Sequence, residues 1–466
     1  MKKFLITVMA LCFMLAALVG CGGGGNANKE TTLTVYYENV LNPASGSGDA
    51  IISTFGGLIS SGSTANVSEQ VLTAYEHTKY VVEGMKAKGY DVVYEDGGWG
   101  EPLRTKQTNA LLTGVGPDVF IGEGQMPEFA QQGYLRPFPD DLAQFVRENC
   151  YPAAYESMEF DGKIYGVAVS PAPSMLIINK ELAYKIWGED YKAPTTWDEW
   201  IQQMEEVTEW SASSGNDTGK NVMPGGPFFG TNYGSYLRTN NFFNQVGASF
   251  YDEETLAPTF ETDKVTQVLT FFQQIKAANS GGNMSTSQEG IDTKFIANEI
   301  VFKIDHAGMV YYHEEQFNQE VIVAPYPKPT ADTPDANMLI ATTFFGVPTY
   351  VNDSKAEVGF DYIRLCLDEG AQTPIRDLGF KCAALKSVVS DDLFEKFPYM
   401  EYSYQVVAQN NVLSIPVFPY DNSKCWAEVG KAIRASVTSG ESIASILSSA
   451  QDQLELYYEN YQNSLK

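Results

Sequence analysis

Polar and aromatic side chains follow each of the first three strands that this 466-residue sequence predicts. Glu38 and Asn39 come after the first strand, Trp99 after the second, and Glu123 and Gln125 after the third. In open α/β sheets, ligands bind outside the carboxyl ends of the strands. Carboxylates and amides offer hydrogen bonds there, and an indole ring offers a face for stacking. These residue types therefore predict a site for a polar solute.

The elements that must position these residues alternate between strand and helix. A helix begins at Ser68, because apolar positions recur after it at alternating spacings of four and three. In chain order we expect a strand at 33–37, the helix from Ser68, a strand at 90–95, a helix at 103–112 and a strand at 117–121. This β-α-β-α-β order predicts the α/β fold class.

Beyond the glycine-rich residues 20–25, the chain carries none of the short motifs that mark common catalytic or nucleotide sites. G-x-S-x-G, H-E-x-x-H, the P-loop, G-x-G-x-x-G and the EF-hand loop are absent from the rest of the sequence. A glycoside hydrolase leaves no such motif, and with 58 acidic residues no single pair of carboxylates is informative. The residues alone therefore give no sign of an enzyme, a cofactor or a metal site.

Composition indicates a large globular chain with an acidic surface. The length favours two domains, and 44% hydrophobic residues can fill two cores. The net charge of −27 disfavours nucleic acid and anionic lipid as partners. Cys150, Cys366, Cys382 and Cys425 are too scattered for a disulfide framework, so we expect buried free thiols.

The first 30 residues predict export and lipid anchoring. Two lysines precede an apolar run from Phe4 to Val19, which is long enough for a signal peptide and short for a membrane span. Leu-Val-Gly-Cys at 18–21 resembles a lipobox, in which the leader (1–20) is removed and the sulfur of Cys21 is acylated. Residues 21–30 then form a lipidated, glycine-rich tether. An ordinary cleaved leader is the alternative.

Short segments over nearly the whole mature chain match one family in their order and spacing. They are GPDVF (116–120), FAQQGYL (129–135), DGKIYGV (161–167), LIINKEL (176–182), PTTWDEW (194–200), IDHAG (304–308), APYP (324–327), AALKS (383–387) and the closing helices around Trp426 and Gly440. Together they resemble family 1 of the extracellular solute-binding proteins of ABC importers, the carbohydrate-binding lipoproteins that include maltose-binding protein.

The resemblance implies a type II periplasmic-binding-protein fold. Such a fold has two lobes, each a mixed sheet flanked by helices, with the ligand in the cleft between them. Lobe one is expected to hold residues 31–170 with 345–396, and lobe two residues 174–342 with 399–466. Residues 43–66 exceed the family's usual link between the first strand and first helix, and we expect an extra loop there near the mouth of the cleft.

The family's ligand chemistry fits the residues at these positions. A pyranose has apolar faces and a rim of hydroxyls, which aromatic rings and polar groups can bind. The resemblance places Phe228, Phe229, Tyr233 and Trp426 as stacking residues and Glu123, Gln125, Asp305 and His306 on the polar rim; Glu38 and Trp99 complete the expected ligand-binding set.

Some of these aromatic residues have a second interpretation as core. Phe228 and Phe229 are adjacent, so in a strand they face opposite sides. Trp426 opens a stripe at helical spacing, which by itself favours burial. Trp197 and Trp200 are expected to be structural.

The resemblance implies a lipid-anchored receptor on the extracytoplasmic face of the cell membrane. It would capture a carbohydrate, most simply an oligosaccharide, and deliver it to the permease subunits of an ABC transporter. We expect a monomer with no nucleic-acid partner that contacts the membrane through its anchor alone. Two alternatives stay open: a secreted glycoside hydrolase, or a binding protein for a peptide or for iron, for which Tyr311-Tyr312-His313 supplies phenolate and imidazole groups.

Overall fold

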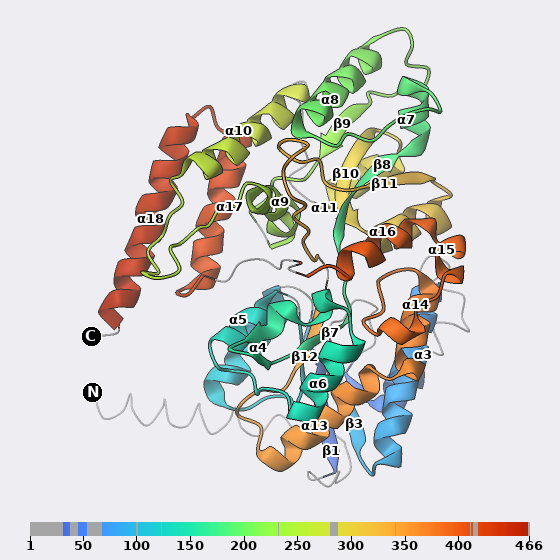
Figure 1. The fold of residues 1–466 in the computed structure, drawn as a ribbon, viewed down its shortest axis with the longest axis vertical. Coiled ribbons are helices and arrows are strands. Elements are labelled where there is room, and N and C mark those ends of the chain that lie inside the picture. Colours follow the sequence, from blue (N-terminus) through green and yellow to red (C-terminus); the bar gives the residue numbers. More distant parts are fainter. Residues whose placement is uncertain are drawn as a thin grey trace, which may run out of the picture.

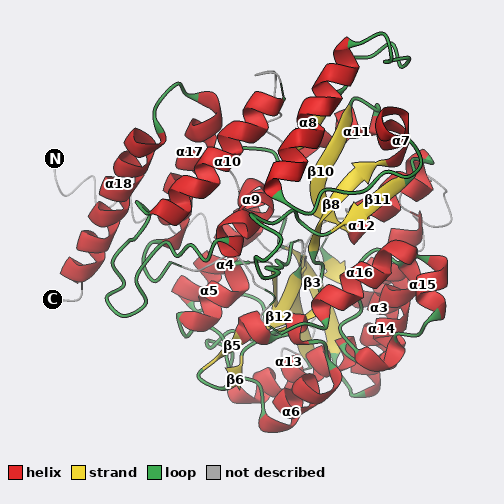
Figure 2. Cartoon of the chain, turned by 45° about the horizontal axis from the view of Figure 1, so that its top comes forward, coloured by secondary structure: helices red, strands yellow, loops and turns green. Residues whose placement is uncertain are grey.

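A computed structural model describes residues 31–37, 45–53, 68–98, 101–122, 124–231, 233–279, 288–340, 342–410, 412 and 418–464. The chain forms two α/β bodies, which we call lobe one and lobe two and which lie one above the other in Figure 1. In each of them helices enclose the strands (Figure 2). This confirms the predicted α/β class.

Lobe one is built on two small sheets. One has the order β1 (Thr32–Tyr37), β3 (Asp91–Asp96), β2 (Gly46–Ser47), and the other the order β4 (Phe120–Gly122), β12 (Thr343–Gly346), β7 (Val167–Ser170). The short strands β5 (Glu159–Phe160) and β6 (Lys163–Ile164) pair beside them. Its helices are α3 (Ser68–Ala87), α4 (Glu101–Thr113), α5 (Gln125–Gln131), α6 (Asp140–Asn149), α13 (Asp353–Cys366), α14 (Glu369–Leu378) and α15 (Asp392–Lys396).

The predicted β-α-β-α-β order is confirmed in lobe one. β1 and β3 are parallel, with Val35 opposite Tyr94, and Val35 also forms a parallel bridge with Val119 just before β4. α3 begins at Ser68 and α4 covers 101–113, as the spacing of apolar residues predicts. The carboxyl ends of these strands therefore lie at one edge of the lobe.

Lobe two is built on one four-stranded sheet. Its order is β11 (Val321–Ala324), β8 (Ser174–Asn179), β10 (Ile300–His306), β9 (Met223–Gly226). The helices of this lobe are α7 (Lys180–Trp187), α8 (Trp197–Ala212), α9 (Tyr233–Gln245), α10 (Asp263–Ala278), α11 (Gln288–Ile296), α12 (Ala307–Tyr311), α17 (Asn422–Thr438) and α18 (Ile443–Ser464). α17 and α18 pack together at one side of it (Figure 1).

Two segments cross between the lobes side by side. Residues 171–173 join β7 to β8, and the segment before β12 returns from lobe two. Ile340 donates its backbone N–H to the Ala172 carbonyl at 2.8 Å, and the Ala172 N–H donates to Thr342 Oγ1 at 3.0 Å. Ser174 donates to the Met338 carbonyl at 2.8 Å. The two crossings are thus held together by their own hydrogen bonds.

The buried side chains form two hydrophobic clusters. One surrounds the sheets of lobe one and extends to Met175, Ile177 and Ile300 in the sheet of lobe two, and the other lies between the sheet of lobe two and α8, α10 and α17. α16 (Pro398–Val407), which the sequence places in lobe two, packs Met400 and Tyr404 into the first cluster and also contacts α12 and β11. The predicted residue boundaries of the lobes stay a prediction.

Two further features concern cysteines and membrane spans. Cys150, Cys366, Cys382 and Cys425 are buried free thiols, as the sequence predicts. Within the described ranges, no helix has both the length and the apolar character needed to cross a bilayer.

Candidate ligand site between the lobes

Several residues of the expected site lie outside the described part of the chain. They are Glu38, Trp99 and Glu123, and also the acylation candidate Cys21. Tyr233 begins α9, but its side chain is not among those described. The predicted insertion at 43–66 is described at 45–53, where β2 pairs with β3.

Gln125 lies at the start of α5, directly after β4, and is buried. Its Nε2 donates to Gln107 Oε1 at 3.0 Å, and Gln107 Nε2 donates to the Ile121 carbonyl at 2.8 Å. A Cβ atom at position 122 would come within 2.6 Å of Gln125 Nε2. Gly122 is therefore required for the amide of Gln125 to fold back over the end of β4.

One turn further along α5, Glu128 connects the two lobes. Its Oε2 atom accepts hydrogen bonds from Arg104 Nη2 of lobe one at 2.5 Å and from Asn422 Nδ2 of lobe two at 2.8 Å. Asn422 is the first residue of α17, and its Oδ1 accepts from the Phe418 N–H at 2.8 Å. Glu128 and Asn422 are both buried. A carboxylate and an amide thus meet across the interface in a water-poor environment.

Asp305, near the carboxyl end of β10, is fully buried and paired with two cations. Its Oδ1 lies 2.9 Å from Arg238 Nη2 of α9, and its Oδ2 lies 3.4 Å from Lys303 Nζ. Burial by itself raises the pKa of Asp305, but the charges of Arg238 and Lys303 outweigh it and hold the pKa below its ordinary value. Asp305 is therefore ionised and fixes the guanidinium of Arg238.

Lys303 extends this ion-pair network into the interior of lobe two. It is fully buried, and its ammonium group binds Asp292 Oδ1 and lies 3.3 Å from His313 Nε2. Burial, followed by the charge of Lys303, lowers the pKa of His313 to about 3. An ammonium group at this nitrogen opposes metal binding there.

The iron alternative finds no support in the geometry around His313. Tyr311 packs edge-on against Phe380, with ring centroids 6.2 Å apart. Among the described residues, no cluster of three or more His, Cys, Asp or Glu side chains could hold a metal ion.

His306 acts as the N-cap of α12. Its Nδ1 accepts a hydrogen bond from the Gly308 N–H at 3.1 Å, so this nitrogen carries no proton. A Cβ at position 308 would come within 2.8 Å of both His306 and Phe380. Burial is the main cause that lowers the pKa of His306 to about 3, against the opposing effect of Asp305. The imidazole is thus a neutral group between β10 and the first turn of α12.

Phe228 and Phe229 follow β9 and are both buried. Phe229 packs edge-on against Phe272 of α10, with centroids 5.1 Å apart. The guanidinium of Arg238 lies 5.5 Å from the centre of the Phe228 ring. Phe228 is therefore next to the Arg238–Asp305 pair, whereas Phe229 belongs to the core of lobe two. Their predicted role in stacking on a ligand stays a prediction.

Trp426 lies one turn into α17 and is 4% exposed. Its indole stacks on Tyr236 at 5.2 Å and meets Phe250 and Phe418 edge-on at 5.5 and 5.8 Å. The stripe that it begins continues with buried Val429 and Ile433. Trp426 packs here as a core residue, and its contact with a ligand stays a prediction. Trp197 and Trp200 also lie in this cluster, as expected of structural residues.

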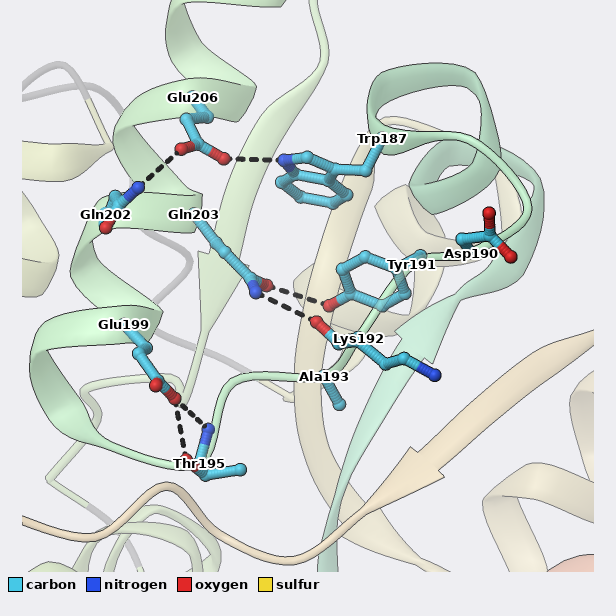
Figure 3. Close-up of a pocket in the computed structure, with 10 residues that line it drawn as sticks. All are labelled: Trp187, Asp190, Tyr191, Lys192, Ala193, Thr195, Glu199, Gln202, Gln203 and Glu206. Atoms are coloured by element: carbon cyan, nitrogen blue, oxygen red, sulfur yellow. Dashed lines mark hydrogen bonds between the residues drawn. The ribbon is translucent and has the colours of Figure 1, made fainter. Parts of the chain in front are cut away.

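A cavity of about 480 Å³ lies within lobe two and is distinct from the interface. Figure 3 shows its lining side chains, which come from the end of α7, from α8 and from the segment between them. Trp187 Nε1 donates to Glu206 Oε2 at 2.6 Å, and Tyr191 donates to Gln203 Oε1 at 2.8 Å. Several of the polar side chains that line the cavity therefore bind one another.

Sequence reasoning missed Glu128 and Asn422, which meet across the interface, and Arg238, which pairs with Asp305 in lobe two. Arg238 had a usable signal, because it is the one Lys or Arg residue between Lys220 and Lys264. Glu128 and Asn422 had none, because 294 positions separate them.

Comparison with known proteins identifies the class. The family model of bacterial extracellular solute-binding proteins matches residues 70–373, so the chain belongs to this family. It is accordingly an extracytoplasmic binding protein rather than an enzyme, and its predicted type II two-lobed fold is confirmed. No curated protein sequence matches the chain.

Solved structures share the fold over almost the whole chain. Maltose-bound MalE3 of T. maritima has a TM-score of 0.68 at 16% identity and covers 91% of this chain and 99% of its own. The MalE domain of Bdellovibrio bacteriovorus, bound to maltotriose, has a TM-score of 0.66 at 15% identity and covers 92% of this chain and 100% of its own. UgpB of Mycobacterium tuberculosis, in complex with glycerophosphocholine, has a TM-score of 0.68 at 13% identity and covers 85% of this chain and 97% of its own. At these identities the likeness shows the fold.

The pKa of His306 predicts a loss of stability in acid. Since its folded pKa of about 3 lies below the ordinary value of 6.5, the unfolded chain binds a proton that the folded chain does not. Stability should therefore fall between about pH 6.5 and pH 3, by about 1.4 kcal/mol per pH unit for this residue. His306→Asn, which keeps an N-cap, should weaken this pH dependence in denaturant unfolding.

Phe380→Leu is a suitable control, because it disturbs the ring contact of His306 without removing a titratable group. It should retain the pH dependence of the parent protein. If His306→Asn retains it as well, His306 is not held neutral by the fold.

Burial of Trp426 predicts a large effect on folding. Trp426→Ala should lower the free energy of unfolding by about 3 to 5 kcal/mol, as expected for loss of a core aromatic residue. Denaturant unfolding measures this change. The affinity of the folded fraction for sugar tests the second interpretation, in which the indole of Trp426 contacts the ligand. An affinity loss of about tenfold or more, with little loss of stability, would instead place the indole against the ligand.

Proposed function

We propose that this protein is a lipid-anchored receptor that binds a carbohydrate, most simply an oligosaccharide, between its lobes and delivers it to an ABC transporter permease. The observation that carries the proposal is family membership combined with nearly complete coverage by sugar-bound structures. Neighbours of the same fold are described as bound to maltose and to maltotriose. A third, from Thermotoga lettingae, is described as bound to α-D-tagatose.

The chemistry of the interface supports a hydroxyl-rich ligand. Lobe one contributes the amide of Gln125 and the carboxylate of Glu128, and lobe two contributes the amide of Asn422 and the guanidinium of Arg238. Such groups donate to and accept from sugar hydroxyls. In this proposal Asp305 acts through Arg238, because both of its oxygens face cations.

The predicted ligand set is retained as part of the proposal. Glu38, Trp99, Glu123 and Tyr233 add the remaining polar and aromatic contacts, together with Phe228 beside Arg238. His306 and the rings of Phe228, Phe229 and Trp426 are all buried in the present structure, so ligand contact with any of them requires the surrounding core to open.

Binding is coupled to closure in this proposal. A solute that contacts both lobes binds the closed arrangement more tightly and shifts the equilibrium towards it. In the present structure, Glu128 and Asn422 already form a hydrogen bond across the lobes. In the complex, a sugar hydroxyl could take the place of either residue in that bond. The permease then recognises the closed surface.

A ligand screen tests the substrate class. Mono- and oligosaccharides, a peptide mixture, glycerophosphodiesters and ferric iron are compared by thermal unfolding, since a ligand at 100 times its Kd stabilises by about 2.7 kcal/mol. We expect a shift with an oligosaccharide. The same ligand should lower the radius of gyration in small-angle scattering. A shift with a non-sugar solute alone would contradict the carbohydrate assignment, and unchanged scattering at saturation would contradict closure.

The lipobox tests the anchor. Cys21→Ser removes the sulfur that would be acylated, so the variant should move from the detergent phase to the aqueous phase in phase partitioning. Cys150→Ser, which removes a buried thiol, should partition as the parent protein does. Equal partitioning of Cys21→Ser and the parent protein would rule out lipid attachment at this residue.

A further inference from the structure

The turn after α4 carries an unusual apolar projection. Leu112 is 72% exposed and Val115 77%, whereas each of the other exposed large apolar residues in the described part of the chain is 48% exposed or less. Residues 107–117 contain no charged side chain, in a chain of which 19% is charged. Singly exposed apolar side chains are common on protein surfaces, but here two of them lie on one uncharged turn.

The backbone holds this turn in place. Gly114 adopts a left-handed conformation with φ +67°, which reverses the chain at the end of α4. The Val115 N–H donates to the Ala110 carbonyl at 3.3 Å, and Tyr350 donates its hydroxyl proton to the Pro117 carbonyl at 2.6 Å. Leu112 and Val115 are therefore held outward by a braced turn.

The turn lies beside the beginning of the globular part. Asp118 donates its N–H to the Thr34 carbonyl at 2.7 Å, and its Oδ2 accepts from the Thr34 N–H at 2.7 Å. Thr34 is the third residue of β1. Val115 is thus only three residues away from a position bonded to the first strand.

The length of chain before β1 limits how far the turn can lie from the membrane. Ten residues lead from Cys21 to Thr31, and ten residues span at most about 36 Å. A globular chain of this length has a radius of gyration of about 22 Å and hence a diameter above roughly 50 Å. If Cys21 carries the lipid anchor of the proposed function, Thr31 and the turn cannot lie on the face of the protein that is farthest from the membrane.

We propose that Leu112 and Val115 form a lipid contact that enters the interfacial layer of the bilayer and orients the anchored receptor with lobe one towards the membrane. This inference rests on the anchor at Cys21, and it revises the expectation that the anchor alone contacts the membrane. The uncharged turn can approach an anionic surface despite the net charge of −27, because salt screens the more distant charges. Because the tether holds the receptor at the membrane, the local concentration of the turn near lipid is high, and two apolar side chains suffice for the contact.

Fluorescence on vesicles tests this contact. Full-length lipidated protein carrying Val115→Cys is labelled with an environment-sensitive nitrobenzoxadiazole dye and bound to phosphatidylethanolamine/phosphatidylglycerol vesicles that contain spin-labelled lipid. The four native thiols of the described chain are buried and should not react in the folded state. We expect a blue-shifted emission and at least twofold quenching.

Matched variants separate lipid contact from proximity. Dye at Leu456→Cys, a 48% exposed site on α18, should show neither the blue shift nor the quenching. Adding Leu112→Asp to the Val115→Cys probe should reduce the quenching by half or more, whereas Leu72→Asp at a 41% exposed site of α3 should not.

The outcomes are distinguished by vesicle flotation. Protein that floats while dye at position 115 remains water-like overturns the lipid contact and leaves the anchor intact. Protein that does not float overturns the anchor and this inference together. An emission change in native membranes but not in pure lipid vesicles would assign the turn to a protein partner and overturn the lipid contact.

Discussion

The paired crossing between the lobes is the constraint on which the architecture depends. Residues 171–173 and the segment before β12 run side by side and are joined through Ala172, Ile340 and Thr342. The same segments lead directly into β8 and β12, so each lobe's sheet begins at the crossing. Two hydrogen-bonded segments at one place are the arrangement expected of a hinge. The proposed ligand site lies between the edges of the two lobes that meet there.

Buried and paired charges hold the end of β10 in lobe two in a fixed position. Asp305 and Lys303 have no exposed surface, and charges removed from water are tolerated only when they are paired. Arg238, Asp292 and His313 provide the partners. The network therefore fixes the end of β10, the position of α9 and the start of α12 relative to one another. Lobe one offers the corresponding rigid group in Glu128, which Arg104 holds in place.

The sequence predicted local structure well, and it could not predict long-range pairing. The alternation of apolar residues and glycine turns placed β1, α3, β3 and α4, because these signals are local. The insertion of β12 between β4 and β7 joins residues more than 170 positions apart, and no local pattern records it. The Glu128–Asn422 bond is of the same kind. The roles of the aromatic residues were ambiguous for another reason. Tryptophan and phenylalanine occur both in stacking sites and in cores, so the residue type alone could not assign Trp426 or Phe229 to one of them.

A crystal structure of the complex tests the central claim most directly. The crystal should contain the intact protein together with the oligosaccharide that stabilises it most. We expect electron density for the sugar between the lobes, with hydrogen bonds from α5 of lobe one and from α9 or the start of α17 of lobe two. A sugar held by one lobe alone, for example in the cavity beside Trp187, would contradict it.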